Sequence, residues 1–133
     1  MAGVRRPAPA RPAPAEKPVN ASGDPAPGRG EVWWVDLDPT KGSEIRKTRP
    51  CLVLTANALN RLRRTVVVVP YSTAASAHPP ITVPVTCRGA RAVAIVDQVR
   101  AISKERLRGR LETASAEDLD SVTTALGRIL ELG

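Results

Sequence analysis

The sequence predicts an α+β protein that is mainly β, a compact barrel of short strands with one helix at the C-terminus. Three observations lead to this fold class. Thr65 is followed by four consecutive valines, the strongest strand signal in the chain. Several other short apolar stretches are separated by residues that favour turns. The last segment, residues 115–132, has the spacing of an amphipathic helix.

The first two expected strands flank a loop. Residues 32–37 mix apolar side chains with tryptophan and end at Asp38 and Pro39, a pair that stops a strand. Residues 39–48 form the loop. Residues 51–55 are apolar up to the last position, which predicts a strand buried on both faces.

A short helical turn and the valine strand come next. Leu59 and Leu62 lie three residues apart within residues 56–64, which indicates one helical turn. The valine strand covers residues 65–69. The Ser, Ala and Pro residues of segment 70–80 predict a second loop.

The remaining strands are short and weakly marked. Residues 81–86 alternate weakly, 92–102 predict two short strands or one bent strand, and 109–112 predict a last strand. The C-terminal helix starts with Ser115 and Asp118 as an acidic capping box. Its expected apolar stripe consists of Leu119, Val122, Leu126, Ile129 and Leu130.

Residues 1–28 form an arm that cannot bury a core. They contain seven prolines and seven alanines but only two valines, a composition typical of extended or disordered chain. Proline interrupts every apolar stretch, so the arm lacks the pattern of a secretory signal peptide. We therefore expect a Pro/Ala-rich arm over residues 1–28 and one folded domain over residues 29–133.

The net charge predicts an anionic partner. The chain carries +7 at pH 7, and four basic and two acidic residues give the arm +2, so +5 belongs to the domain. Nucleic acid and acidic protein both fit this charge. No apolar run is long enough to span a membrane, so we expect no membrane partner and a cytoplasmic location.

The two cysteines and single histidine exclude several classes of site. They are too few for a disulfide framework or a zinc site, and Cys51 is expected to be a small buried residue. With His78 alone, one chain cannot supply a catalytic histidine pair. Asp36 and Asp38 lack a third acid for two-metal cleavage, so we expect neither a metal ion nor another cofactor.

A charged loop beside a buried strand is the most specific candidate for a site. Residues 42–50 read GSEIRKTRP and lead directly into the apolar residues 51–54. Pro50 lacks an N–H group and stiffens the backbone beside Arg49, so we expect Pro50 at the start of the strand. An arginine held in this way suits a phosphate, because its planar guanidinium donates two parallel hydrogen bonds.

The segments around this loop resemble a known family. RGEVWWVDLDP enters the loop from Arg29, VVVVPYST follows at residues 66–73, and IVDQVRAI covers residues 95–102. In this order and spacing they resemble the MazF/PemK family, the toxins of type II toxin–antitoxin pairs, over residues 29–132. The resemblance implies an SH3-like barrel of antiparallel strands, as in MazF, PemK and CcdB proteins.

The resemblance also implies an activity and its partners. The family cleaves single-stranded RNA at specific sequences without a metal ion, in mRNA and also in rRNA or tRNA. A cognate acidic antitoxin, MazE-like, neutralises the toxin, and the toxin–antitoxin complex binds its own promoter DNA. The family forms homodimers, which we expect here through the stripe of the C-terminal helix or through the first strands.

RNA can be cleaved without a metal ion because its own 2′-OH attacks the adjacent phosphate. The protein then orients the RNA, stabilises the extra charge on phosphorus and helps two protons to move. Arg49 fits the charge role, in which one donor in a dry site contributes roughly 3–4 kcal/mol. A guanidinium stays protonated and is a poor general base, although the family is described with this arginine in acid–base catalysis.

Ser72 stands after the valine strand, where the family has threonine. Its hydroxyl is a candidate to donate to a non-bridging phosphate oxygen or to position the 2′-OH. Thr73 is adjacent, so either hydroxyl is a candidate for this role. Thr48, beside Arg49, is expected to bind the substrate.

Further residues are candidates for contact with RNA. Glu44, the only carboxylate of the charged loop, is a candidate general base or an acceptor for a base amino group. Asp97 and Gln98 match a family pair that faces bound RNA, where Gln98 can read a base edge. Trp33 and Trp34 point to opposite faces of a strand; we expect one in the core and the other stacked on a base or at the dimer interface.

Two other functions fit part of the sequence. A DNA gyrase poison like CcdB shares the fold but ends in Trp-Gly-Ile, whereas this chain ends in Ile-Leu-Glu-Leu-Gly and has no tryptophan after Trp34. A non-catalytic basic module that binds nucleic acid needs only the barrel and its charge. Incubation with single-stranded RNA in EDTA separates these functions, because only the toxin cleaves the RNA.

Overall fold

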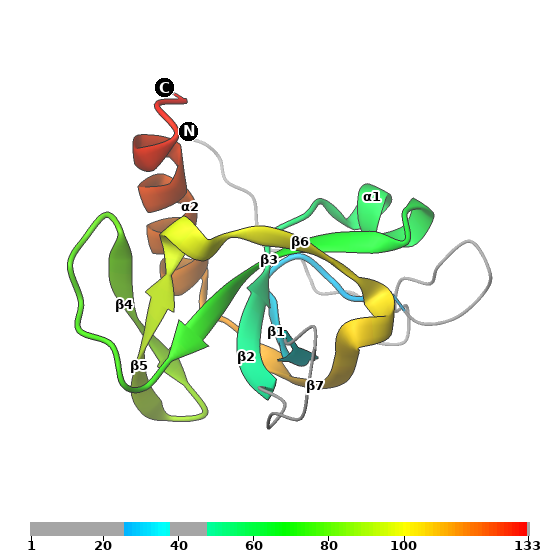
Figure 1. Cartoon of the computed structure of the whole chain (residues 1–133), viewed down its shortest axis with the longest axis horizontal. Coiled ribbons are helices and arrows are strands. Elements are labelled where there is room, and N and C mark those ends of the chain that lie inside the picture. The colour runs from blue at the N-terminus through cyan, green and yellow to red at the C-terminus, as the bar shows by residue number, and fades with distance from the viewer. Residues whose placement is uncertain (1–25, 38–47, 133) are drawn as a thin grey trace, which may run out of the picture.

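The computed structural model describes residues 26–37 and 48–132. A curled sheet forms the body of the protein, and one helix stands against its β4–β5 end (Figure 1). The elements are β1 (Glu31–Asp36), β2 (Thr48–Val53), α1 (Asn57–Leu62), β3 (Thr65–Ser72), β4 (Thr82–Cys87), β5 (Ala90–Ile95), η1 (Val96–Gln98), β6 (Arg100–Ser103), η2 (Lys104–Arg106), β7 (Leu107–Thr113) and α2 (Ala116–Ile129).

β3 is the strand around which the sheet is organised. Residues 65–68 pair with β6, residues 68–70 pair with β2, and the last two residues, Tyr71 and Ser72, pair with β5. All strand pairs are antiparallel, and with α2 they confirm the expected α+β class. The strand order β4-β5-β3-β2-β1-β7 does not close into a ring within the described residues, so the barrel is a curled open sheet.

The alternation of side chains along β2 and β3 divides the interior into two clusters. Leu52 and Tyr71 belong to the cluster beneath α2, which we call the helix-side core. Cys51 and Val68 belong to a smaller cluster on the other face of these strands, the far-side core. Residues 51–54 are all buried, which confirms the expected strand with both faces covered. Each fully buried valine contributes roughly 1.5–3 kcal/mol to folding.

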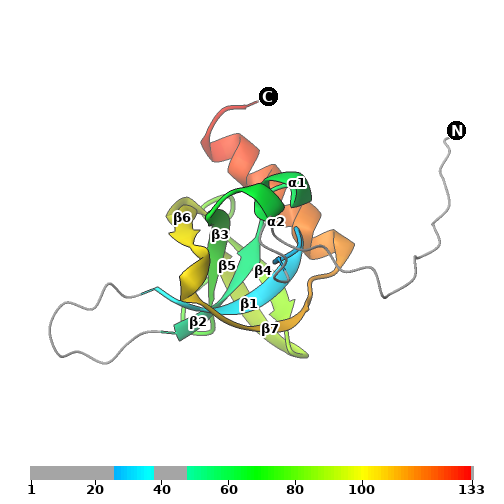
Figure 2. The same ribbon diagram turned by 90° about the vertical axis from the view of Figure 1, so that its right-hand side faces the viewer.

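Figure 2 shows α2 packed across the top of the sheet, with its C-terminal end pointing away from it. The apolar stripe of α2 contacts the core of its own chain: Val122 and Ala125 are buried, Leu119, Leu126 and Ile129 pack against the helix-side core, and Leu130 is 53% exposed. Two dimer surfaces were expected, the stripe and the first strands. Because the stripe packs within its own chain, the first strands remain as the candidate dimer surface. None of the helices in the described part is long and apolar enough to cross a membrane.

The start of α2 forms half of the expected capping box. The Ser115 hydroxyl accepts a hydrogen bond from the Asp118 N–H at 3.0 Å. The Asp118 carboxylate instead accepts the N–H of Thr86 on β4 at 2.9 Å. Because β4 lies at one end of the sheet, this bond covers a backbone donor on an edge strand.

The two strands that contain proline, β2 and β3, extend further than the sequence predicted. β2 begins at Thr48 and contains Pro50, which was expected to be its first residue. At Pro50 the strand pairs with β1, and pairing with β3 starts only at Cys51, so the residue without an N–H lies at an open edge. β3 likewise continues through Pro70 to Ser72, because its partner changes there from β2 to β5. The second loop therefore starts after Ser72.

Other expected elements are present with shifted ends. Residues 92–102 form two strands, β5 and β6, separated by η1, and the last strand, β7, extends beyond residues 109–112 at both ends. Residues 1–25 of the expected arm lie outside the described residues, as do Asp38 and residues 39–47 of the expected loop. Ala26, inside the expected arm, is buried against the domain.

Candidate active site

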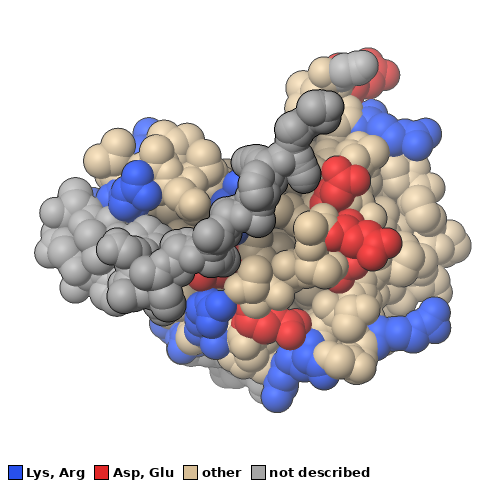
Figure 3. Space-filling model, turned by 180° about the vertical axis from the view of Figure 1, so that it is seen from behind, with Lys and Arg blue, Asp and Glu red and all other residues tan. Residues whose placement is uncertain are grey.

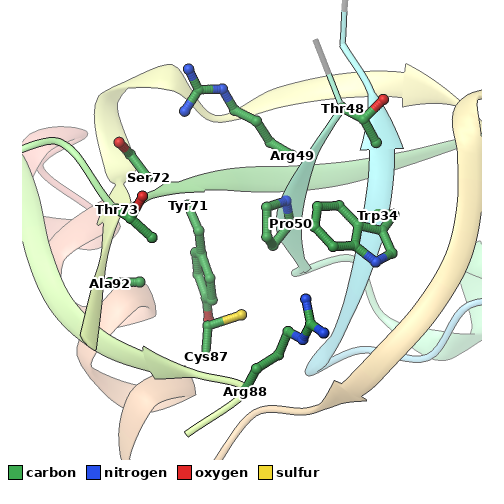
Figure 4. Close-up of a pocket in the computed structure, with 10 residues that line it drawn as sticks. All are labelled: Trp34, Thr48, Arg49, Pro50, Tyr71, Ser72, Thr73, Cys87, Arg88 and Ala92. Carbon is green, nitrogen blue, oxygen red and sulfur yellow. The ribbon is translucent and has the colours of Figure 1, made fainter. Parts of the chain in front are cut away.

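β2 and β3 bring Arg49 and Ser72 to the same face of the sheet. The two strands pair Cys51 with Pro70, and the same antiparallel register continued by two residues places Ser72 across from Arg49. Because side chains alternate along a strand, both residues lie on the face of Cys51. Figure 4 shows the two side chains extending toward the upper side of the site.

A cavity of about 380 Å³ opens where β2 begins and β3 ends. Four residues predicted from the sequence line it: Thr48 and Arg49 from β2, Ser72 from β3, and the adjacent Thr73. Arg49 is half-buried, whereas Thr48 and Thr73 are exposed. The structure thus collects the expected phosphate ligand and both candidate hydroxyls at one rim of the sheet.

The Ser72 hydroxyl is held by the turn that follows it. Its Oγ accepts hydrogen bonds from the N–H groups of Ala74 at 3.0 Å and Ala75 at 3.3 Å. The side chain is only 8% exposed, so the oxygen has a defined position. The oxygen accepts both bonds, so the hydroxyl proton remains available for donation to a ligand.

A second arginine, Arg100, lies close to the same face. Burial raises the pKa of the Cys51 thiol to about 12, and the positive charges of Arg100 and Arg49 oppose this rise. Arg100 reaches this position from β6, where it pairs with Val68 of β3. Arg100 belongs to the IVDQVRAI motif but was not among its predicted site residues, because only strand pairing with β3 places it near Arg49.

The other predicted residues lie elsewhere. Asp97 and Gln98 are exposed on η1, which packs against α2 and β3, and neither lines the cavity. Glu44 lies outside the described residues, so its role stays a prediction.

Trp34 and Arg88 complete the cavity, and the sequence did not indicate that they meet. The Arg88 guanidinium carbon lies 5.8 Å from the centroid of the Trp34 ring, a cation–π distance. Trp34 is half-buried in the cavity wall. Trp33 is also half-buried; it packs against the far-side core and donates its Nε1–H to Glu31 at 2.9 Å. Neither tryptophan is a fully buried core residue, in contrast to the expectation for one of them.

Tyr71 and Cys87, in the cavity wall on the α2 side, carry no charge at neutral pH. Burial raises the pKa of Tyr71, and the nearby carboxylate of Asp118 adds to this effect. Burial also raises the pKa of the Cys87 thiol, with Glu112 as a further cause. Both groups are therefore protonated at neutral pH. Within residues 26–37 and 48–132, no group of three or more His, Cys, Asp or Glu side chains is arranged to hold a metal ion.

The face of the protein opposite to the one seen in Figure 1 is less suited to bind a polyanion. Figure 3 shows Asp and Glu side chains gathered in the middle of this face, with Lys and Arg toward its rim. The cavity, by contrast, is lined by the cations of Arg49 and Arg88 without a carboxylate among its lining residues. A phosphate-containing ligand is therefore favoured at the cavity.

Comparison with known proteins gives consistent matches over the domain. The family described as a PemK-like, MazF-like toxin of type II toxin–antitoxin systems matches residues 28–130. Endoribonuclease PemK of Escherichia coli is 37% identical over 107 residues, which cover 77% of this chain and 80% of PemK. Endoribonuclease MazF9 of Mycobacterium tuberculosis is 37% identical over 113 residues, which cover 78% of this chain and 96% of MazF9.

Solved structures agree with these relatives. A crystal structure of MazE–MazF from Deinococcus radiodurans aligns with a TM-score of 0.73 at 27% identity, over 83% of this chain and 100% of the matched chain. An endoribonuclease in complex with its cognate antitoxin, from a mycobacterial species, aligns with a TM-score of 0.69 at 26% identity, over 81% of this chain and 98% of the other. The chain therefore belongs to the PemK-like, MazF-like toxins of type II toxin–antitoxin systems, as its sequence motifs predicted.

Proposed function

We propose that this chain is an endoribonuclease that cleaves single-stranded RNA at specific sequences, without a metal ion, by attack of the RNA's own 2′-OH. The observation that carries the proposal is the placement of Arg49 and Ser72 on one face, at the rim of a cavity. The endoribonuclease names of the relatives PemK and MazF9 support the same activity.

The reaction exchanges one bond to phosphorus for another. The 2′-oxygen forms a bond to phosphorus while the bond to the 5′-oxygen breaks, and the 5′-oxygen leaves with that electron pair. One proton leaves the 2′-OH and one is taken up by the 5′-oxygen. The products are a 2′,3′-cyclic phosphate and a 5′-OH, and the step needs neither an oxidant nor a reductant.

Arg49 and Ser72, which line the cavity, and Arg100, which is not among its lining residues but has its charge near Cys51, are grouped in this proposal as the phosphate site. Arg49 donates to the non-bridging oxygens, which gain charge in the transition state, and Arg100 adds a second positive charge nearby. The Ser72 hydroxyl donates to a phosphate oxygen or positions the 2′-OH. Because Ala74 and Ala75 already hold Ser72 Oγ, this donor needs little reorganisation during the reaction.

The remaining predicted residues have supporting roles in this proposal. Thr48 and Thr73 bind the RNA at the rim of the cavity, where both are exposed. Asp97 and Gln98 contact RNA that extends beyond the cavity, since η1 exposes both side chains. Glu44 is proposed either to take up the proton of the 2′-OH or to accept a hydrogen bond from the amino group of a base.

The partners follow from the family and from charge. We propose that a cognate acidic antitoxin of the MazE type covers the positively charged domain in the cytoplasm, and that the complex binds its promoter DNA. Structures of relatives with MazE or with a cognate antitoxin support such a partner.

We also propose a homodimer through the first strands, because the α2 stripe is already covered. Light scattering that gives a monomer mass at tens of micromolar, roughly, would contradict the dimer.

Incubation of single-stranded RNA with the protein in EDTA tests the activity. The intact protein is expected to cut the RNA, and Arg49→Ala is expected to cut it at least about a hundredfold more slowly under the same conditions. Arg128→Ala serves as the control, because Arg128 is an exposed cation in the last turn of α2. Loss of cleavage in both variants would show that only net charge is required.

A further inference from the structure

Trp34 and Arg88 border a part of the cavity that the phosphate site does not occupy. Side chains alternate along β2 and β3, so Pro50 and Tyr71 face the side opposite to the phosphate site. Trp34 pairs with Pro50 across β1 and β2 and faces the same side. Figure 4 shows Trp34, Pro50, Tyr71 and Arg88 grouped there, below the Arg49 side chain.

The backbone holds Arg88 in an unusual turn. Arg88 and Gly89 form the two-residue turn between the paired ends of β4 and β5, and both have positive φ, 55° and 78°. This is the geometry of a type I′ turn, in which a residue with a side chain is strained. The Arg88 N–H donates to Glu112 on β7 at 2.8 Å. The turn is thus tied to β7, while its guanidinium lies over Trp34 on β1.

The Arg88 guanidinium is available to a ligand. Arg108 and Arg110 form ion pairs with Asp36 and Glu31, but no acidic group in the described part of the chain pairs with Arg88. Its side chain is exposed, and the Trp34 ring beneath it is only half-buried. The guanidinium and the indole ring face each other with flat surfaces, and an aromatic ligand can stack between them.

The cavity wall also contains a polar group without a partner. The Tyr71 hydroxyl is buried and makes no hydrogen bond within the described residues. Tyr71 is 1% exposed and lines the same cavity as Trp34 and Arg88. Tyr71 thus adds an aromatic ring to the wall of this part of the cavity.

We infer that Trp34 and Arg88 form a nucleobase site, in which the base next to the cleaved phosphodiester stacks on the indole ring under the guanidinium. The inference rests on the proposed RNA cleavage, which places a phosphate at Arg49. Pro50, the partner of Trp34, directly follows Arg49, so the two sites are neighbours along β2. Bases stack on aromatic rings and on arginine planes in single-stranded RNA complexes.

Stacking requires the Arg88 side chain to lift. A base stacks at about 3.4 Å from each neighbour, so two contacts need roughly 7 Å between the planes. The guanidinium carbon is now 5.8 Å from the ring centroid. An exposed side chain makes this small movement without disturbing the turn, because Glu112 holds the Arg88 backbone rather than its guanidinium.

Fluorescence of Trp34 tests the site directly. Trp33→Phe leaves Trp34 as the only tryptophan in the chain. The probes are a single-stranded oligodeoxynucleotide, which cannot be cleaved because it lacks the 2′-OH, and an abasic oligomer of equal length and charge. The first probe is expected to quench Trp34 fluorescence, and the abasic oligomer is expected to bind with much weaker quenching. Equal quenching by both probes would overturn the base site.

Substitution of Arg88 separates stacking from charge. In the Trp33→Phe protein, Arg88→Ala is expected to weaken binding of the base-containing probe by about tenfold or more. It is expected to weaken binding of the abasic oligomer only as much as Arg128→Ala does. Equal losses for the two probes would show that Arg88 contacts only phosphate and would overturn the inference, as would no loss at all.

Cleavage of RNA is measured separately on each variant. If the intact protein cleaves RNA while Arg88→Ala binds both probes normally, the base site is wrong and the proposed function stands. If the probes behave as expected but RNA is never cleaved, the proposed function fails and the base site is supported.

Discussion

Arg49 and Ser72 each lie two residues beyond Cys51 and Pro70, the last pair of β2 and β3, and both line one cavity, where the N–H groups of Ala74 and Ala75 hold the Ser72 hydroxyl. The strand ends explain why a polar pair can sit here. Two residues further into each strand, Cys51 and Pro70 are buried, whereas the strand ends open into a cavity. The sheet therefore brings a cation and a hydroxyl to the rim of one cavity.

Replacement of Arg49 tests the charge role. Arg49→Ala is expected to lower kcat/KM for RNA by at least about a hundredfold, near 3 kcal/mol, because the charge on the phosphorane loses its donor. Arg49→Lys is expected to restore little, since an ammonium group cannot supply two parallel donors. Thermal melting by circular dichroism checks that both variants fold. Near-normal cleavage by folded Arg49→Ala would remove Arg49 from the mechanism.

Ser72 and Thr73 are separated by single substitutions. Ser72→Ala is expected to slow cleavage by roughly ten- to a hundredfold, because it removes both a donor and the acceptor that holds the following turn. Ser72→Thr keeps the hydroxyl and is expected to retain activity. Thr73→Ala is expected to cost less than Ser72→Ala, and the exposed Ser76→Ala provides the control. A larger loss for Thr73→Ala would assign the role to Thr73.

The buried thiol of Cys51 predicts a loss of stability at high pH. The pKa of Cys51 is raised from 9.0 to about 12 in the folded protein. The neutral thiol therefore favours the folded state fully below pH 9, and this contribution falls as the pH rises from 9 toward 12. The expected slope is at most about 1.4 kcal/mol per pH unit.

Urea unfolding at several alkaline pH values measures that slope. Cys51→Ala is expected to be less stable at neutral pH, because it leaves a cavity, but to lose less stability above pH 9 than the parent protein. Burial is the main cause of the raised pKa of Tyr71 in both proteins, and the charge of Cys51 is the smallest cause, so the difference between the two slopes reports on the Cys51 thiol together with its effect on Tyr71. Identical slopes would contradict the assignment.

The cap of α2 predicts a measurable effect on folding alone. Ser115→Ala removes the acceptor for the Asp118 N–H and is expected to lower the free energy of unfolding by about 1 kcal/mol. Ser121→Ala, an exposed position inside the same helix, is expected to be neutral or slightly stabilising, since alanine favours helix. Urea unfolding compares the two variants. Equal stabilities would show that the cap contributes nothing.

Sequence patterns predicted the elements better than the site. The run of valines predicted β3, whose two faces are buried in the two cores, and periodicity predicted α2, whose one apolar face packs on the helix-side core. Pro50 and Pro70 led to strands that were too short, since the pattern cannot show that a partner strand ends or changes at a proline. The motif around Arg49 predicted a phosphate-binding role that stays a prediction, and the structure places Arg49 in a cavity wall.

Contacts between distant segments were beyond the reach of pattern analysis. The meeting of Arg88 with Trp34 depends on the turn between β4 and β5 and on the curl of the sheet. Arg100 approaches Cys51 because β6 pairs with the first half of β3, and no spacing rule sets that register. Such positions follow from strand pairing rather than from local sequence.

Analysis of RNA ends tests the central claim most directly. Once the cut site in a long RNA has been mapped, the same RNA is made with 2′-deoxyribose at the nucleotide before the cut, and both substrates are incubated with the protein in EDTA. The account predicts that the unmodified RNA yields a 2′,3′-cyclic phosphate and a 5′-OH, and that the deoxy substrate stays intact at this site. Cleavage of the deoxy substrate, or cleavage of RNA only after Mg²⁺ is added, would contradict attack by the 2′-OH at the Arg49 site.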